Sequence, residues 1–143
     1  MTQEEKDLVV KDLCGRLPYG VMLKHISAEK PFKLFSIKRD EYASYKKDGV
    51  ELAVNGIYYD WYVNDIYHDI ELYIKPYLRP MNSMTEEEQK EYHKTFRVEA
   101  DTHGFTYIES FESFDWLTAH HFDFRDLISK GLALEASQGM YNN

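Results

Sequence analysis

The chain has few of the features that mark secreted or membrane proteins. Its single cysteine, Cys14, excludes an internal disulfide. No apolar run approaches the roughly 18 residues of a membrane span, and the opening TQEEKD lacks the basic head and apolar middle of a signal peptide. We therefore expect a cytoplasmic protein that makes no membrane contact.

The familiar motifs of catalysis and cofactor binding are absent too. The sequence holds no phosphate-binding glycine loop, no CxxC pair, no HExxH and no GxSxG. We therefore expect no cofactor and a protein that is not an enzyme. Cys14 falls on the apolar stripe of the first predicted helix, which favours a small buried side chain over a nucleophile.

What the chain does have is the composition of one folded domain. Its 143 residues are 43% hydrophobic and 15% aromatic, with twelve tyrosines. The net charge of −8 divides into −1 for residues 1–80 and −7 for residues 81–143. An acidic surface repels phosphate backbones, so the second part favours a protein partner, and a basic one fits it best.

The pattern predicts an α+β fold in three parts. Residues 1–18 hold a helix over 3–14, with Thr2 and Glu5 as its capping box and Gly15 as a left-handed stop. Residues 19–77 alternate with period two and predict strands at 21–26, 32–38, 50–54, 57–63 and 69–74. An Asn55-Gly56 turn joins two of them. Five antiparallel strands suggest a small SH3-like barrel, and an open meander is the alternative.

Residues 84–135 form the predicted helical part, after a proline-rich connector at 75–83. A capping box of Thr85 and Glu88 begins a helix over 86–96, followed by a polar loop at 97–104 and a short strand or approach segment at 105–108. Ser110 or Ser113 can cap the next helix, and Asp123 a short last one that ends at Gly131.

The densest group of potentially chemical side chains is His120, His121, Asp123 and Arg125. His120 and Asp123 could share a metal ion in a hydrolase, with a further ligand from outside the group, namely His93, His103 or Asp101. Adjacent histidines on a helix diverge by about 100°, so both could face one metal only if the helix ended between them. The simpler interpretation is a helix end followed by a cap, which leaves these residues as a polar contact surface.

The barrel offers the other candidate surface. Tyr58 and Tyr62 could line an aromatic groove for an extended or proline-rich peptide. Basic residues alternate there with aromatics, as in single-strand nucleic-acid grooves, although acidic residues cancel most of their charge. These basic residues are Lys24, Lys33, Lys38, Arg39, Lys46 and Lys47.

Three blocks of sequence resemble a family of uncharacterised small proteins of gut anaerobes and their phages or other mobile elements. The blocks are KDLCGRLPYGV, IKPYLRPMNSMTEEE and DWLTAHHFDFRDLISKGLALEASQGMY, at residues 11–21, 74–88 and 115–141. The chain departs from that family's pattern in having Asn82, Thr118, Phe124, Asp126 and Ser137, where the resemblance implies Ser, Asn, Tyr, Gly and Pro. It implies a setting and no activity.

We therefore expect a non-enzymatic accessory protein of a phage or mobile-element programme that binds another protein. The alternatives are a nucleic-acid-binding module that uses the barrel and a metal-dependent hydrolase centred on His120 and Asp123.

Overall fold

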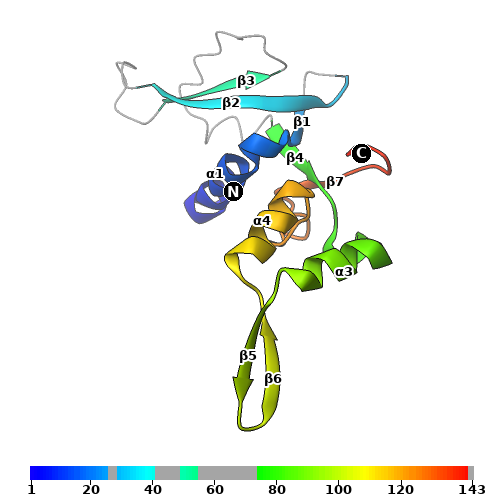
Figure 1. Ribbon diagram of the computed structural model, residues 1–143. Coiled ribbons are helices and arrows are strands. Elements are labelled where there is room, and N and C mark those ends of the chain that lie inside the picture. The colour runs from blue at the N-terminus through cyan, green and yellow to red at the C-terminus, as the bar shows by residue number, and fades with distance from the viewer. Residues whose placement is uncertain (26–28, 41–48, 55–73, 142–143) are drawn as a thin grey trace.

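The computed structural model describes residues 1–25, 29–40, 49–54 and 74–141. Helices and strands both occur, which confirms the α+β class (Figure 1). In chain order the elements are α1 (Gln3–Arg16), the 3-10 helix η1 (Leu17–Tyr19), β1 (Met22–His25), β2 (Phe32–Asp40), β3 (Gly49–Val54), β4 (Ile74–Leu78), the 3-10 helix η2 (Met81–Ser83), α3 (Glu86–Lys94), β5 (Arg97–Asp101), β6 (Gly104–Ile108), α4 (Phe111–Ala119) and β7 (Leu134–Glu135).

Helix α1 begins where the sequence predicts and ends later. The Thr2 hydroxyl accepts the Glu5 N–H, and the Glu5 carboxylate accepts the Thr2 N–H, so the capping box is complete. Gly15 lies inside the helix, and Gly20 takes the left-handed conformation with φ +69°. The prediction for Cys14 was wrong, because its side chain is exposed.

The main sheet has the strand order β3-β2-β1-β4-β7. Neighbours from β3 to β4 are antiparallel, but β4 and β7 are parallel, so the sheet is mixed. The described strands do not show a closed barrel, and the fifth strand comes from the C-terminal part and not from residues 19–77. The predicted turn at Asn55-Gly56, the strand at 57–63 and residues 69–73 lie outside the described residues.

Strand β4 occupies residues that the sequence assigns to a connector. Pro76 lies inside the strand and pairs with Leu23 of β1. A proline cannot donate to a neighbouring strand, so it is tolerated where one side of the strand is unpaired. Pairing with β7 begins only at Tyr77, which leaves Pro76 beside the open side.

Two hydrophobic clusters hold the fold together. The larger packs α1 against the sheet and the C-terminal turns; its buried members are Val9, Leu13, Val21, Leu23, Leu34, Ile74, Leu78, Leu127, Leu132 and Ala133. The smaller joins α3, α4 and the turn that follows α4 through Tyr92, Leu117 and Phe122. Burial of a large apolar side chain contributes about 1.5–3 kcal/mol, so these clusters carry most of the stability.

Two predictions for the C-terminal part need correction. The polar loop at 97–104 is instead strand β5 and the turn of a hairpin with β6, and this hairpin extends away from the rest of the described chain (Figure 1). Residues 123–131 form successive turns and no α-helix. Within the described ranges, no helix is both long and apolar enough to cross a membrane.

Candidate functional site

The sequence-predicted cluster follows α4, and its carboxylate is committed to the backbone. Asp123 is buried, and its two oxygens accept the N–H groups of Leu127 at 2.8 Å and Ile128 at 2.9 Å. The predicted cap therefore exists, although it organises turns and not a helix. Both oxygens of this carboxylate are thus engaged by backbone amides.

His120 is also engaged. Its Nδ1 lies 2.8 Å from the carbonyl oxygen of Trp116, and its ring stacks on the Trp116 indole at 4.0 Å. A carbonyl can only accept, so the Nδ1–H donates to it. Among the residues that the structure describes, no three His, Cys, Asp or Glu side chains come together to hold a metal ion. The proposed further ligands Asp101 and His103 lie at the hairpin turn, where the Asp101 carboxylate accepts the His103 N–H.

His121 has the most unusual environment of the four. Its backbone is left-handed, with φ +66°, and its ring stacks on Tyr141 at 3.7 Å. Burial, reinforced by the nearby charges of Arg16 and Arg79, lowers the pKa of His121 to about 4. The Tyr141 hydroxyl donates to the Tyr77 carbonyl oxygen and accepts the Met22 N–H. His121 is thus a neutral packing residue that holds the C-terminal segment against the sheet.

Arg125 belongs to a charged group that reaches α1. Its guanidinium lies over the Phe124 ring at 4.5 Å and has one nitrogen 3.7 Å from Asp12 Oδ1. The other oxygen of Asp12 accepts a 2.7 Å hydrogen bond from Arg16 Nε, and both Asp12 and Arg16 are fully buried. Arg125 therefore lies beside the buried Asp12–Arg16 pair without a hydrogen bond to it.

Arg79, which the sequence analysis did not single out, links more segments than any of the four predicted residues. Its backbone N–H donates to the His121 carbonyl and its carbonyl accepts the Asp123 N–H. Its guanidinium lies 4.1 Å above the Phe122 ring and donates to both oxygens of Glu88, at 2.7 and 2.8 Å. This hydrogen-bonded ion pair holds the pKa of the Glu88 carboxyl below its usual value.

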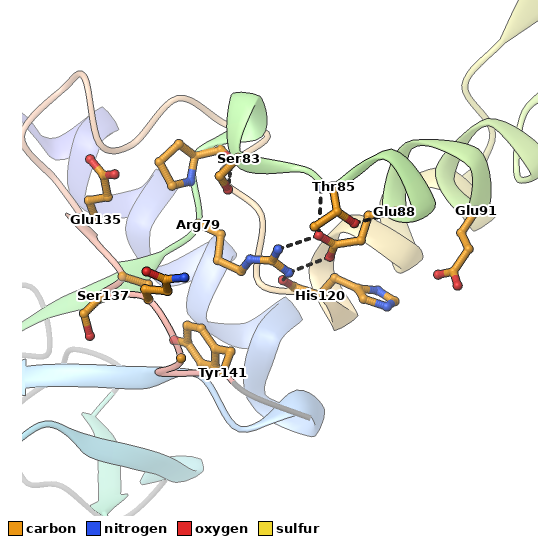
Figure 2. Close-up of a pocket in the computed structure, with 13 residues that line it drawn as sticks. Arg79, Ser83, Thr85, Glu88, Glu91, His120, Glu135, Ser137 and Tyr141 are labelled. Atoms are coloured by element: carbon orange, nitrogen blue, oxygen red, sulfur yellow. Dashed lines mark hydrogen bonds and ion pairs between the residues drawn. The ribbon is translucent and has the colours of Figure 1, made fainter.

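A pocket of about 750 Å³ opens beside this ion pair (Figure 2). Arg79 and Glu88 form its central feature, while Glu135 and Ser137 line it from the C-terminal segment and Glu91 from α3. Arg79 is the only Lys or Arg in the lining, against three glutamates, so the pocket favours a cationic or neutral polar group.

Among the described residues of the pocket lining, the hydroxyl groups of Ser83 and Thr85 are engaged by the backbone and are not paired with an activating base. Ser83 Oγ donates to the Pro80 carbonyl, and the Thr85 hydroxyl caps α3 by accepting the Glu88 N–H. The Nδ1 of His120 is held by Trp116. A hydroxyl nucleophile needs an adjacent base to activate it, and no described contact in the lining joins a hydroxyl to His120.

The β5–β6 hairpin presents a second surface that the sequence analysis missed. The register pairs Val98 with Tyr107 and Ala100 with Phe105, which places these four side chains on one face of the two-stranded sheet. Phe105 is 74% exposed, Tyr107 67% and Val98 51%. A hairpin normally buries such a face, so this apolar face has no partner within the described chain.

The base of the hairpin is fixed by hydroxyl groups. The Thr95 hydroxyl donates to the Tyr92 carbonyl and is hydrogen-bonded to the Ser113 hydroxyl at 2.8 Å, and the Ser110 hydroxyl donates to the Thr95 carbonyl at 2.7 Å. Ser113, which is fully buried, also accepts the Ser110 N–H. These bonds tie the end of α3 to the start of α4 at the two ends of the hairpin, so its direction is set by the body of the protein.

The fold and these surfaces define an α+β protein with a mixed sheet and a protruding apolar hairpin. Comparison with protein-family models, curated proteins and solved structures finds no match. Tyr58 and Tyr62, the aromatic residues of the predicted groove, lie outside the described residues, so the sequence-based prediction for them stays a prediction.

Proposed function

We propose that this chain is a non-enzymatic module that binds another protein, and that the apolar face of the β5–β6 hairpin is its docking element. The observation that carries the proposal is the exposure of Val98, Phe105 and Tyr107 on one face of an isolated hairpin. The resemblance to small phage and mobile-element proteins supplies the proposed setting.

The energetics of hairpins support this role. A two-stranded hairpin is at best marginally stable in water, and it normally needs a third strand or a packed face. Large exposed apolar side chains grouped on one surface mark interaction sites far more often than single exposed ones do. The hydroxyl bonds between Thr95, Ser110 and Ser113 hold this hairpin in a fixed direction, which reduces the entropy lost on binding.

The non-enzymatic part of the proposal is supported by the contacts of the predicted cluster. Both oxygens of Asp123 accept the N–H groups of Leu127 and Ile128, and Nδ1 of His120 is bonded to the Trp116 carbonyl oxygen; these are the two residues of the hydrolase alternative. A catalytic acid or base needs a free atom within reach of the substrate. The pocket beside Arg79 provides no activated nucleophile either.

Site-specific photo-crosslinking tests the docking face. A photoreactive phenylalanine analogue replaces Phe105 on the apolar face in one variant and Thr106 on the opposite face in the matched control. In lysate of the source cell, position 105 is expected to give a discrete heterologous adduct that position 106 lacks. Unlabelled wild-type chain should displace it, whereas chain carrying Phe105→Ser and Tyr107→Ser should not. Equal adducts from both faces, or equal competition by both chains, contradict the proposal.

A further inference from the structure

Resting on the proposed function, we infer that the hairpin's partner is a different protein whose apolar contact strip is flanked by lysine or arginine side chains. Four kinds of surface could cover the face Val98, Ala100, Phe105 and Tyr107: a second copy of the chain, a membrane, a nucleic acid or a heterologous protein. The charges around the hairpin and the size of the face separate them.

The surroundings of the hairpin are strongly acidic. Residues 86–115, which span α3, the hairpin and the first half of α4, carry nine acidic and three basic residues, a net charge of −6. One of the three basic residues, Arg97, is already paired with Glu99 at 2.9 Å. Exposed carboxylates stand at the base of the hairpin on Glu109 and Glu112, and two more stand on Glu86 and Glu87 in the first turn of α3, which is the end of that helix away from the hairpin.

This charge disfavours three of the four candidates. Anionic lipid surfaces and phosphate backbones are repelled by a field of this sign. A second copy would bring two regions of charge −6 together, which opposes self-association at moderate ionic strength. A heterologous protein with basic residues beside its apolar strip is instead attracted by these negative charges.

The size of the face also argues against a homodimer. A fully exposed aromatic side chain presents about 200 Å², so the three large residues of this face expose on the order of 400 Å². An obligate homodimer interface buries about 2,000–5,000 Å² in total, which is at least about 1,000 Å² on each partner. The face is instead the size of an anchor patch, around which complementary charges at the rim set the choice of partner and the rate of association.

The direct test uses the full-length chain labelled with ¹⁵N and two synthetic eight-residue peptides. One alternates leucine with lysine and the other alternates leucine with glutamate. We expect the lysine peptide to shift the amide signals of Val98, Ala100, Phe105 and Tyr107, with an affinity at least about fivefold above that of the glutamate peptide. Raising KCl from about 50 to about 500 mM should remove most of that preference.

Charge-reversal variants give the control. The double variant Glu109→Lys, Glu112→Lys should reduce the preference for the lysine peptide by at least about threefold. Glu4→Lys with Glu29→Lys makes the same change in net charge at exposed positions outside the 86–115 stretch and should leave the preference unchanged.

The inference is overturned if the glutamate peptide binds equally well, if neither peptide shifts these amides at about 1 mM, or if phosphatidylserine vesicles or poly(U) shift them. Shifts that change with protein concentration alone point to a second copy and also overturn it. A face-specific crosslink in lysate together with peptides that show no charge preference would leave the proposed function standing and remove only this inference. Failure of the crosslink removes the function itself.

Discussion

The guanidinium of Arg16 donates a 2.7 Å hydrogen bond to the carbonyl oxygen of Phe122, 106 residues further along the chain. The same side chain is fully buried and pairs with Asp12 one helical turn earlier. A charged hydrogen bond thereby attaches helix α1 to the turn after α4, in addition to the packing of the apolar face of the helix. The aromatic ring of Phe122 is in contact with a second arginine, Arg79, so this one residue joins both halves of the chain.

Replacement of Arg16 should therefore be severely destabilising. Arg16→Met removes the hydrogen-bonded partner of the buried Asp12 carboxylate and leaves it only the Arg125 guanidinium at 3.7 Å. Removing one partner of a buried ion pair typically costs about 3–5 kcal/mol. The double variant Asp12→Asn, Arg16→Met removes both charges and should recover a large part of that loss. Urea unfolding followed by circular dichroism measures both. If the double variant is no more stable than Arg16→Met, the buried pair is not the cause.

The ion pair of Glu88 with Arg79 should make stability fall in acid. The pKa of Glu88 is lowered in the folded protein, so its contribution is present above the ordinary value near 4.5 and is lost as the pH falls through the lowered pKa. Glu88→Gln should cost about 1 kcal/mol at neutral pH, because the pair is partly exposed. The measurement is the free energy of unfolding of the wild-type protein and of Glu88→Gln, at neutral pH and at a pH below the lowered pKa of Glu88. A deficit that persists unchanged in acid excludes the ion pair as its source.

His121 should contribute a pH dependence in a higher range. Its pKa is about 4 in the folded protein, against an ordinary 6.5. Between these values the unfolded chain binds a proton that the folded chain does not, so stability decreases as the pH falls from 6.5 towards 4. His121→Asn keeps a residue that tolerates φ +66° and removes the titration. The difference in melting temperature between the wild-type protein and His121→Asn should be smallest in acid. A difference that does not change with pH would contradict the lowered pKa of His121.

Asp126 occupies a strained backbone position. Its φ of +60° lies in the left-handed region, which costs most side chains about 1–2 kcal/mol and glycine almost nothing. Asp126→Gly should therefore raise the free energy of unfolding by up to about 1 kcal/mol, since the added freedom of the unfolded chain offsets part of the gain. Asp126→Ala keeps the strain and should not stabilise. Guanidinium unfolding of both variants decides the matter.

The hairpin face should be dispensable for folding. Phe105→Ser with Tyr107→Ser removes two side chains that are mostly exposed, so the unfolding free energy should change by no more than about 0.5 kcal/mol. Ser113→Ala at the buried base serves as a contrast, because it leaves the Ser110 N–H without its acceptor and removes the bond between the Ser113 and Thr95 hydroxyls. Thermal unfolding should separate the two, and a large loss in the first variant would mean that the face packs within the protein.

Local signals in the sequence predicted local features well. The capping boxes of Thr2 with Glu5 and Thr85 with Glu88 exist as predicted, because each depends on residues three positions apart. The burial of Arg16 could not be foreseen, since its acceptor lies on a distant turn. The α1 helix consequently buries Asp12 and Arg16, while Cys14, an apolar residue by type, is exposed.

The hairpin was missed for a different reason. Arg97, Glu99 and Asp101 alternate with Val98 and Ala100, so the segment appears polar when it is considered along the chain and amphipathic only when it is considered as a strand. Strand β7 is two residues long and pairs in parallel with β4, so its only sequence signal is the apolar run before it. Of the predicted cluster, Asp123 accepts backbone N–H groups, but those of Leu127 and Ile128 in a series of turns, so it is not the N-cap of a helix as predicted.

The contacts of Tyr141 have a consequence for synthesis on the ribosome. Its hydroxyl bridges β1 and β4, and the Met22 N–H that it accepts lies 119 residues earlier. Helix α1, with Asp12 and Arg16, is synthesised long before the Phe122 carbonyl that accepts the Arg16 hydrogen bond. The edge of β4 likewise has no neighbouring strand until β7 is synthesised. Since contacts of such long separation form slowly, the nascent chain exposes an incomplete sheet until β7, the last of the described strands, is translated. During that interval the exposed sheet edge is prone to aggregation, which a chaperone would prevent.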